Sequence, residues 1–133
     1  MEAMTEIAKG WKANGRTESG SGSWRHPSFP VMRKVKGKWR GVIDLKWLNS
    51  QCMDDAYPLP RIDDLLIKQG KNTCFSVMDL KDAFHQVPMH PDSRPYTGTD
   101  TPIGIQQWKV VSMGWKNGVA YCQRNLEVGL ALV

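Results

Sequence analysis

The sequence contains few cysteines and no long apolar run. Its three cysteines, Cys52, Cys74 and Cys122, are widely spaced and odd in number, which argues against a disulfide framework and favours a reducing compartment. A membrane-spanning helix needs about 20 apolar residues, whereas the apolar runs here are short. The N-terminus has no apolar core of the signal-peptide type. We therefore expect an intracellular protein, in the cytoplasm or the nucleus, that crosses no membrane.

The overall composition is that of a folded domain. The chain has 133 residues, of which 41% are hydrophobic and 23% are charged. These values lie near the averages of globular proteins and argue against wholesale disorder. The length gives room for one domain of ordinary size or for one piece of a larger domain.

Positive charge is concentrated near the N-terminus. The net charge is +5, and residues 1–50 carry ten Lys or Arg against four Asp or Glu, whereas residues 51–133 carry eight against nine. Five of the eight residues from Arg33 to Arg40 are basic. Such a local field suits a polyanion, namely nucleic acid, nucleotide phosphates or an acidic membrane. A solvated hairpin face explains the same charges equally well.

The apolar periodicity, glycines and prolines predict a mixed α+β fold. We expect a helix over residues 1–13, a Gly/Ser-rich loop over 14–30, and a basic β-hairpin with strands near 31–35 and 39–45 turning at Lys36-Gly37. Farther along we expect a helix from Ile62 to Gly70, a buried strand over 74–78, a loop over 90–95, strands over 96–101 and 105–111, and a last helix over 117–132. That last helix places Val119, Cys122, Leu126 and Leu130 on one face.

Asp79 follows directly after the expected buried strand. A carboxylate in this place is a frequent ligand for hard cations such as Mg²⁺, which prefer oxygen donors. An aspartate that only caps the turn after a strand fits the same spacing. Two-metal phosphoryl transfer needs several oxygen ligands around ions about 3.5–4 Å apart, and no second strand-borne acidic cluster is evident. The pairs Asp54-Asp55 and Asp63-Asp64 are interpreted as surface pairs.

Trp39 and Arg40 lie together on the returning strand of the basic hairpin. A guanidinium group can bind phosphate oxygens through two parallel hydrogen bonds. The indole of Trp39 can stack on a base or pack beneath the hairpin, and packing is the commoner role of a tryptophan.

Several short strings, taken in order, carry a resemblance to one family. They are Lys38-Trp39-Arg40, Ile43-Asp44-Leu45, Leu48-Asn49, Tyr57 to Leu66, Phe75-Ser76, Asp79 to Val87, Met89-His90-Pro91, Thr101-Pro102, Lys116-Asn117 and Gln123-Arg124. Their order and spacing resemble the reverse transcriptases of long-terminal-repeat retroelements, of the gypsy-like and retroviral type. The resemblance covers roughly Ile7 to Val133. It implies a right-hand polymerase, with a fingers β-hairpin and a partial palm over residues 31–133.

The resemblance also implies roles for single residues. Asp79 would be the first catalytic aspartate and a ligand of Mg²⁺ or Mn²⁺, a cofactor expected only in a complete polymerase. Phe84 would be a steric gate that excludes a ribose 2′-hydroxyl. The residues expected at the deoxynucleotide are Arg33, Lys34, Arg40, Asp82, Ala83, Phe84, Met113 and Gly114. Those expected at nucleic acid are Lys36, Lys38, Trp39, Trp115 and Lys116. The expected partners are an RNA or DNA template with its primer, and dNTPs.

The family pattern is incomplete in these 133 residues. The second acidic motif of the family, aromatic-x-Asp-Asp, does not occur, and the family places it downstream of the last helix. Gly118-Val119 replaces Ala-Pro, which removes a proline that fixes the turn. We therefore expect no primer extension by the chain alone. Two other hypotheses remain open, namely a non-catalytic nucleic-acid-binding remnant and a marginally folded product of a decayed element.

Overall fold

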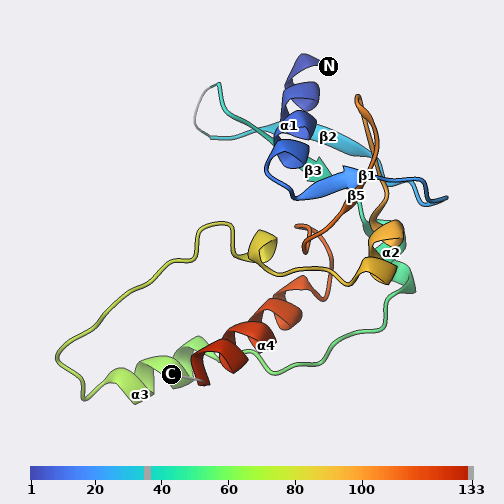
Figure 1. The fold of residues 1–133 in the computed structure, drawn as a ribbon. Helices are drawn as coiled ribbons and strands as arrows, with labels where there is room; N and C mark the ends of the chain where they lie inside the picture. The colour runs from blue at the N-terminus through green and yellow to red at the C-terminus, as the bar shows by residue number, and fades with distance from the viewer. Residues whose placement is uncertain (35–36, 132–133) are drawn as a thin grey trace.

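Helices and short strands alternate in the computed structural model, which describes residues 1–34 and 37–131 (Figure 1). In chain order the elements are α1 (Glu2–Ala13), β1 (Thr17–Ser19), β2 (Ser28–Met32), β3 (Trp39–Ile43), α2 (Lys46–Gln51), α3 (Ile62–Gln69), η1 (Ala83–Gln86), η2 (Pro91–Thr97), β4 (Thr99–Thr101), β5 (Gly104–Trp108) and α4 (Gly118–Ala131), where η marks a 3₁₀ helix. The predicted α+β class is confirmed. Within the described residues, no helix combines the length and apolar character needed to cross a bilayer.

The strands form two small antiparallel sheets. One sheet has the order β1-β5-β4, and the other is the β2–β3 hairpin. The predicted hairpin is confirmed, and its first strand begins earlier than expected, at Ser28. The Arg33 amide donates to the Lys38 carbonyl at 2.8 Å, and Gly37 adopts a φ of 79° in the turn. Lys36, the other residue of the predicted turn, lies outside the described residues.

The main core lies between α1, the hairpin and β5. Its buried members are Met4, Trp11, Ile43, Leu45 and Trp108. Apolar residues at helical spacing form one face of α1, which explains why this helix packs as predicted. Trp11 approaches the hairpin backbone closely at Gly41, where a Cβ atom would lie 2.3 Å from the indole. The side chain missing at Gly41 therefore makes room for α1.

Two segments predicted as loops contain regular structure. Thr17–Ser19 pairs with Gln106–Trp108, so part of the Gly/Ser-rich stretch is strand β1. This polar segment forms a strand because it pairs with β5, which lies far along the chain, and the local sequence does not reveal that pairing. The expected loop over 90–95 and the start of the next expected strand are instead η2. There Pro91 occupies the first turn and the His90 side chain accepts a hydrogen bond from the Asp92 amide.

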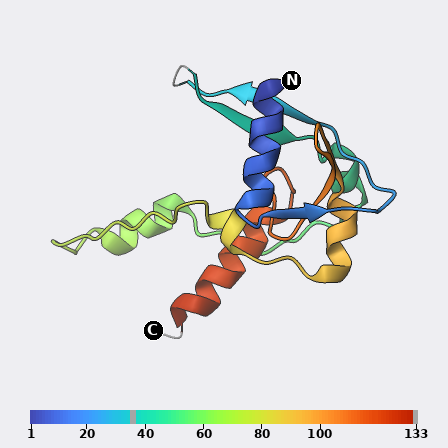
Figure 2. The same cartoon turned by 45° about the horizontal axis from the view of Figure 1, so that its top comes forward.

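The predicted buried strand over 74–78 is wrong. This segment has no regular secondary structure and is exposed, with Val77 94% and Met78 87% accessible. Within the described residues no strand pairs with it, so its backbone groups face solvent instead of a ladder. The predicted helix α3 forms but also buries no side chain. Figure 2 shows α3 and the segment after it extending away from the rest of the chain.

Helix α4 is held by the extended connection that precedes α3. Arg124 forms an ion pair with Asp55 at 2.8 Å, and the Tyr57 hydroxyl donates to the Glu127 carboxylate. The face predicted for α4 is only partly correct. Of the four residues predicted on this face, Cys122 is buried, whereas Val119, Leu126 and Leu130 are exposed, and Ala120 is buried beside Cys122 instead.

Candidate functional site

A cleft of about 630 Å³ lies between α1, the β2–β3 hairpin and the start of η1. We call it the hairpin cleft. It brings together six residues that the sequence predicted at substrate or nucleic acid: Arg33, Lys34, Trp39, Arg40, Asp82 and Met113. These residues come from segments up to 80 positions apart in the chain (positions 33 and 113). The fold therefore assembles one concave site from the larger part of the predicted nucleotide set.

The hairpin side of the cleft is cationic. Arg33, Lys34 and Arg40 are all exposed. Within the described residues, none of the three forms an ion pair. Their charges are therefore available to an anionic ligand, and two of the three groups are guanidinium forks that suit phosphate oxygens.

Asp82 stands on the other side of the cleft in an unusual backbone conformation. Its φ of 52° and ψ of 43° are left-handed, and it is the one non-glycine residue of the described chain with positive φ. Aspartate tolerates this region better than most residues do. The Asp82 carbonyl accepts from the His85 amide at 2.9 Å, which starts η1. The backbone therefore turns sharply here and directs the carboxylate into the cleft region.

Arg16 and His85 are cleft residues that sequence reasoning missed. The Arg16 Nη2 atom lies 2.7 Å from Asp82 Oδ2. Burial lowers the pKa of His85, the Arg16 guanidinium lowers this pKa further, and the Asp82 carboxylate partly offsets both effects. The imidazole stacks on Trp108 with 5.7 Å between ring centroids. Arg16 sits in a Gly/Ser-rich stretch without periodicity, so no local pattern marks it.

Three predicted substrate residues do not line the hairpin cleft. Ala83 is the first residue of η1 and is not part of the cleft lining. The Phe84 ring packs against the first residue of α4, where a Cβ atom on Gly118 would lie 3.3 Å from it. Gly114 has a φ of 101°, and its carbonyl accepts from Asn49 at 2.8 Å. These positions follow the cleft residues in sequence, but the fold turns them toward α2 and α4.

The predicted nucleic-acid residues are distributed over two regions. Trp39 lines the cleft and is 44% exposed, so part of its indole is accessible to a ligand and part is packed. Lys38 is exposed beside it. Trp115 instead packs on the core cluster. Lys116 is paired with Asp54 at 2.8 Å, and its hydrogen bond and charge lower the pKa of Asp54.

Asp79 lies in the exposed segment that follows α3. The part of the chain that the structure describes contains no group of three or more His, Cys, Asp or Glu side chains placed to hold a metal ion. Mg²⁺ is commonly held by one or two carboxylates together with waters and substrate phosphates. The role of Asp79 as a metal ligand therefore stays a prediction.

The family described as reverse transcriptase (RNA-dependent DNA polymerase) matches residues 31–133. The chain therefore belongs to the reverse transcriptase family. It is 35% identical over 96 residues, or 72% of its length, to the retrovirus-related Pol polyprotein from transposon 412 of Drosophila melanogaster.

Two viral proteins show the same similarity. The enzymatic polyprotein of Cauliflower mosaic virus (strain Strasbourg) is 37% identical over 104 residues, which is 76% of this chain. The genome polyprotein of Petunia vein clearing virus (isolate Shepherd) is 36% identical over 110 residues, or 80% of this chain. This chain spans only 8%, 15% and 5% of the lengths of the three relatives. It corresponds to a short part of retroelement polymerase proteins.

Proposed function

We propose that this chain supplies the deoxynucleotide-binding part of a reverse transcriptase that copies an RNA or DNA template from a primer. In this proposal the β2–β3 hairpin is the fingers hairpin, and Asp79 lies in the first part of the palm. The observation that carries the proposal is the convergence of Arg33, Lys34 and Arg40 on one cleft with Asp82 and Met113 opposite. These three cations form no ion pair within residues 1–34 and 37–131, and on a concave surface they are complementary to the negative charge of a triphosphate.

The chemistry of the hairpin cleft is binding and orientation. Arg40 lies on β3, whose pairing with β2 fixes the backbone that carries the guanidinium. A guanidinium on a rigid strand can hold phosphate oxygens through two directed hydrogen bonds. The Arg16–Asp82 pair neutralises the opposite wall, so the carboxylate repels an incoming anion less than it would alone. The family implies a divalent metal in the complete enzyme.

Replacing Arg40 with Ala is expected to weaken binding of dTTP by about 10- to 100-fold, because a hydrogen bond to a charged group contributes about 1.5–3 kcal/mol. Isothermal titration calorimetry of dTTP into the full chain measures this. Lys38→Ala is the matched control, since it removes an equal charge from the same hairpin outside the cleft lining. Its effect should stay below about fivefold. Equal losses for both variants would contradict a specific cleft.

The same two variants distinguish nucleotide binding from the second candidate function, which is that of a nucleic-acid-binding remnant. The exposed cations along the hairpin favour it, because phosphate contacts need charge and not a shaped cleft. On that hypothesis dTTP does not bind measurably, and Arg40→Ala and Lys38→Ala weaken a primer–template duplex alike. A steep fall of duplex affinity with salt accompanies this result.

We also expect the chain alone to extend no primer. The 133 residues contain no aromatic-x-Asp-Asp motif, and the described residues gather no carboxylate cluster around Asp79. Stabilisation of the charge that develops on the transferred phosphoryl group would therefore be missing. The measurement is incorporation of labelled dTTP on a poly(rA)/oligo(dT) primer–template with Mg²⁺. Incorporation that disappears in Asp79→Ala would contradict the expectation.

A further inference from the structure

An open hollow of about 640 Å³ lies at the end of the β2–β3 hairpin opposite its turn. Pro27 and Asp44 line it, and the Asp44 amide donates to the Pro27 carbonyl at 2.9 Å, one residue beyond the paired strands. We call this hollow the hairpin-base site. It shares no lining residue with the hairpin cleft, and the ladder between the two is about 13 Å long at about 3.3 Å per residue. The nucleotide binding proposed above does not use it.

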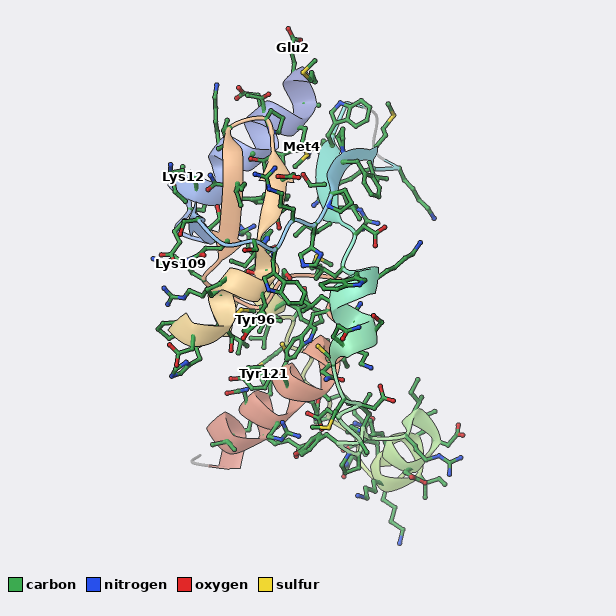
Figure 3. The ribbon with its side chains drawn as sticks, turned by 90° about the vertical axis from the view of Figure 1, so that its right-hand side faces the viewer. Glu2, Met4, Lys12, Tyr96, Lys109 and Tyr121 are labelled. Carbon is green, nitrogen blue, oxygen red and sulfur yellow. The ribbon has the colours of Figure 1, made fainter. Side chains whose placement is uncertain are left out.

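Two tryptophans form the apolar part of the hairpin-base site. Trp24 and Trp47 both line it, and their ring centroids are 4.6 Å apart. Trp24 is also packed edge-on against Tyr96 at 5.3 Å, and Figure 3 shows Tyr96 in the middle of the molecule. Trp47 nevertheless stays 59% exposed. Packing against Trp24 therefore holds the Trp47 ring in place while more than half of the residue is accessible to a ligand.

Two basic side chains belong to the same lining. Arg25 and Lys46 are exposed, and neither forms an ion pair within residues 1–34 and 37–131. Among the described residues that line the site, Asp44 is the one acid, and its carboxylate accepts a hydrogen bond from the Lys46 amide at 3.0 Å. Two cations against one carboxylate leave a formal charge of +1. The site therefore attracts an anion, but its charge alone provides little affinity.

An exposed indole beside two cations is suited to an unpaired nucleic-acid strand. Every nucleobase has a planar face that can stack on an aromatic side chain, whatever the base sequence. In a duplex the neighbouring base pairs cover these faces, so a duplex offers this site only its phosphates. We propose that the hairpin-base site binds single-stranded DNA or RNA, with one base stacked on Trp47 and the adjacent phosphates at Arg25 and Lys46. This proposal extends the function proposed above, because a template must be unpaired where it is copied.

Replacing Trp47 with Ala is expected to weaken binding of fluorescein-labelled (dT)12 by about 5- to 100-fold, as loss of one stacked base predicts. The affinity for the blunt (dA)12–(dT)12 duplex should stay unchanged. Fluorescence anisotropy with the full chain measures both. Trp47→Phe should restore most of the single-strand affinity, since phenylalanine also offers a ring for stacking. Phe29→Ala is the matched control, because it removes a 46% exposed aromatic side chain from β2 outside the lining of the site.

The two cations are tested through the salt dependence of (dT)12 binding. Each phosphate contact to a single strand contributes about 0.7 to the slope of log affinity against log salt concentration. Arg25→Ala and Lys46→Ala should each reduce the slope by about this amount. Arg61→Ala, which removes an exposed arginine beside α3, should leave the slope unchanged.

Several results would overturn the proposal. They are no measurable binding of (dT)12, equal affinities for (dT)12 and the duplex, equal effects of Trp47→Ala and Phe29→Ala, or salt slopes that Arg25→Ala and Lys46→Ala leave unchanged. Titration of dTTP tests the nucleotide function separately, because the hairpin-base site and the hairpin cleft share no lining residue. Trp47→Ala should therefore bind dTTP as the parent chain does. A parent chain that binds (dT)12 through Trp47 but does not bind dTTP would contradict the nucleotide function alone.

Discussion

Replacing Trp108 with Ala is expected to lower the free energy of unfolding by about 3–5 kcal/mol, the range measured for buried large aromatic side chains. Trp108 is 2% exposed and belongs to the main core cluster. Its ring lies 4.9 Å from Trp11 and 5.7 Å from His85, between centroids. The indole N–H also donates to Thr99 Oγ1 at 3.2 Å. The substitution therefore leaves a cavity and removes one hydrogen bond that the Thr99 hydroxyl accepts, while this hydroxyl still donates to the Thr97 carbonyl at 2.9 Å.

Urea unfolding followed by circular dichroism measures this change. Trp47→Ala is the matched control, because it removes the same side chain where 59% of the residue is exposed. Trp47 stacks on Trp24, so its loss should cost no more than about 1.5 kcal/mol. A domain of this size is stable by only about 5–15 kcal/mol, so Trp108→Ala should move the urea midpoint much further. Equal midpoint shifts for the two variants would contradict the placement of the core.

The second large effect is expected for Gly98→Ala, which should cost about 3 kcal/mol or more, at or above the upper end of overpacking effects. A Cβ atom at Gly98 would lie 2.1 Å from the carbonyl oxygen of Trp24. The obstacle is backbone, and the Gly98 carbonyl also accepts from the His26 amide at 2.7 Å. The φ of −48° is open to any residue, so the effect is purely steric. Neither backbone segment can move away without breaking the hydrogen bond between the His26 amide and the Gly98 carbonyl.

Gly129→Ala is the matched control for Gly98→Ala. Gly129 lies within α4, and a Cβ atom there would meet nothing within 4 Å. Alanine in a helix interior is favoured over glycine by about 0.5–1 kcal/mol, so this variant should be slightly more stable than the parent chain. Thermal unfolding shows whether each variant is less stable or more stable than the parent chain. A stable Gly98→Ala variant would show that residues 24 and 98 are not in contact.

Local patterns were sufficient to predict the elements whose partners are near in sequence. The hairpin and α1 were predicted because their alternation and helical spacing are local properties. The strand over 74–78 was not predicted correctly, because apolar residues such as Val77 form a strand only where another strand pairs with them. Likewise β1 depends on β5, and neither segment alone indicates the pairing.

The candidate site was predictable to a similar degree. The family resemblance implied that Arg40 and Asp82 both lie at the nucleotide, and both line the hairpin cleft. Arg16 was not predictable, because its partner Asp82 lies 66 residues away and neither neighbourhood is periodic.

The pairing of β1 with β5 has a consequence for the order of events during synthesis. The buried hydrogen bond from Thr17 to Gln106 joins residues 89 positions apart. A ribosome that adds about 5–20 residues per second needs roughly 5 to 20 s to make this span. The hairpin, whose strands are neighbours, can form during that interval, whereas β1 must wait without a partner. The wall of the hairpin cleft that carries Arg16 is therefore completed only after β5 has left the ribosome.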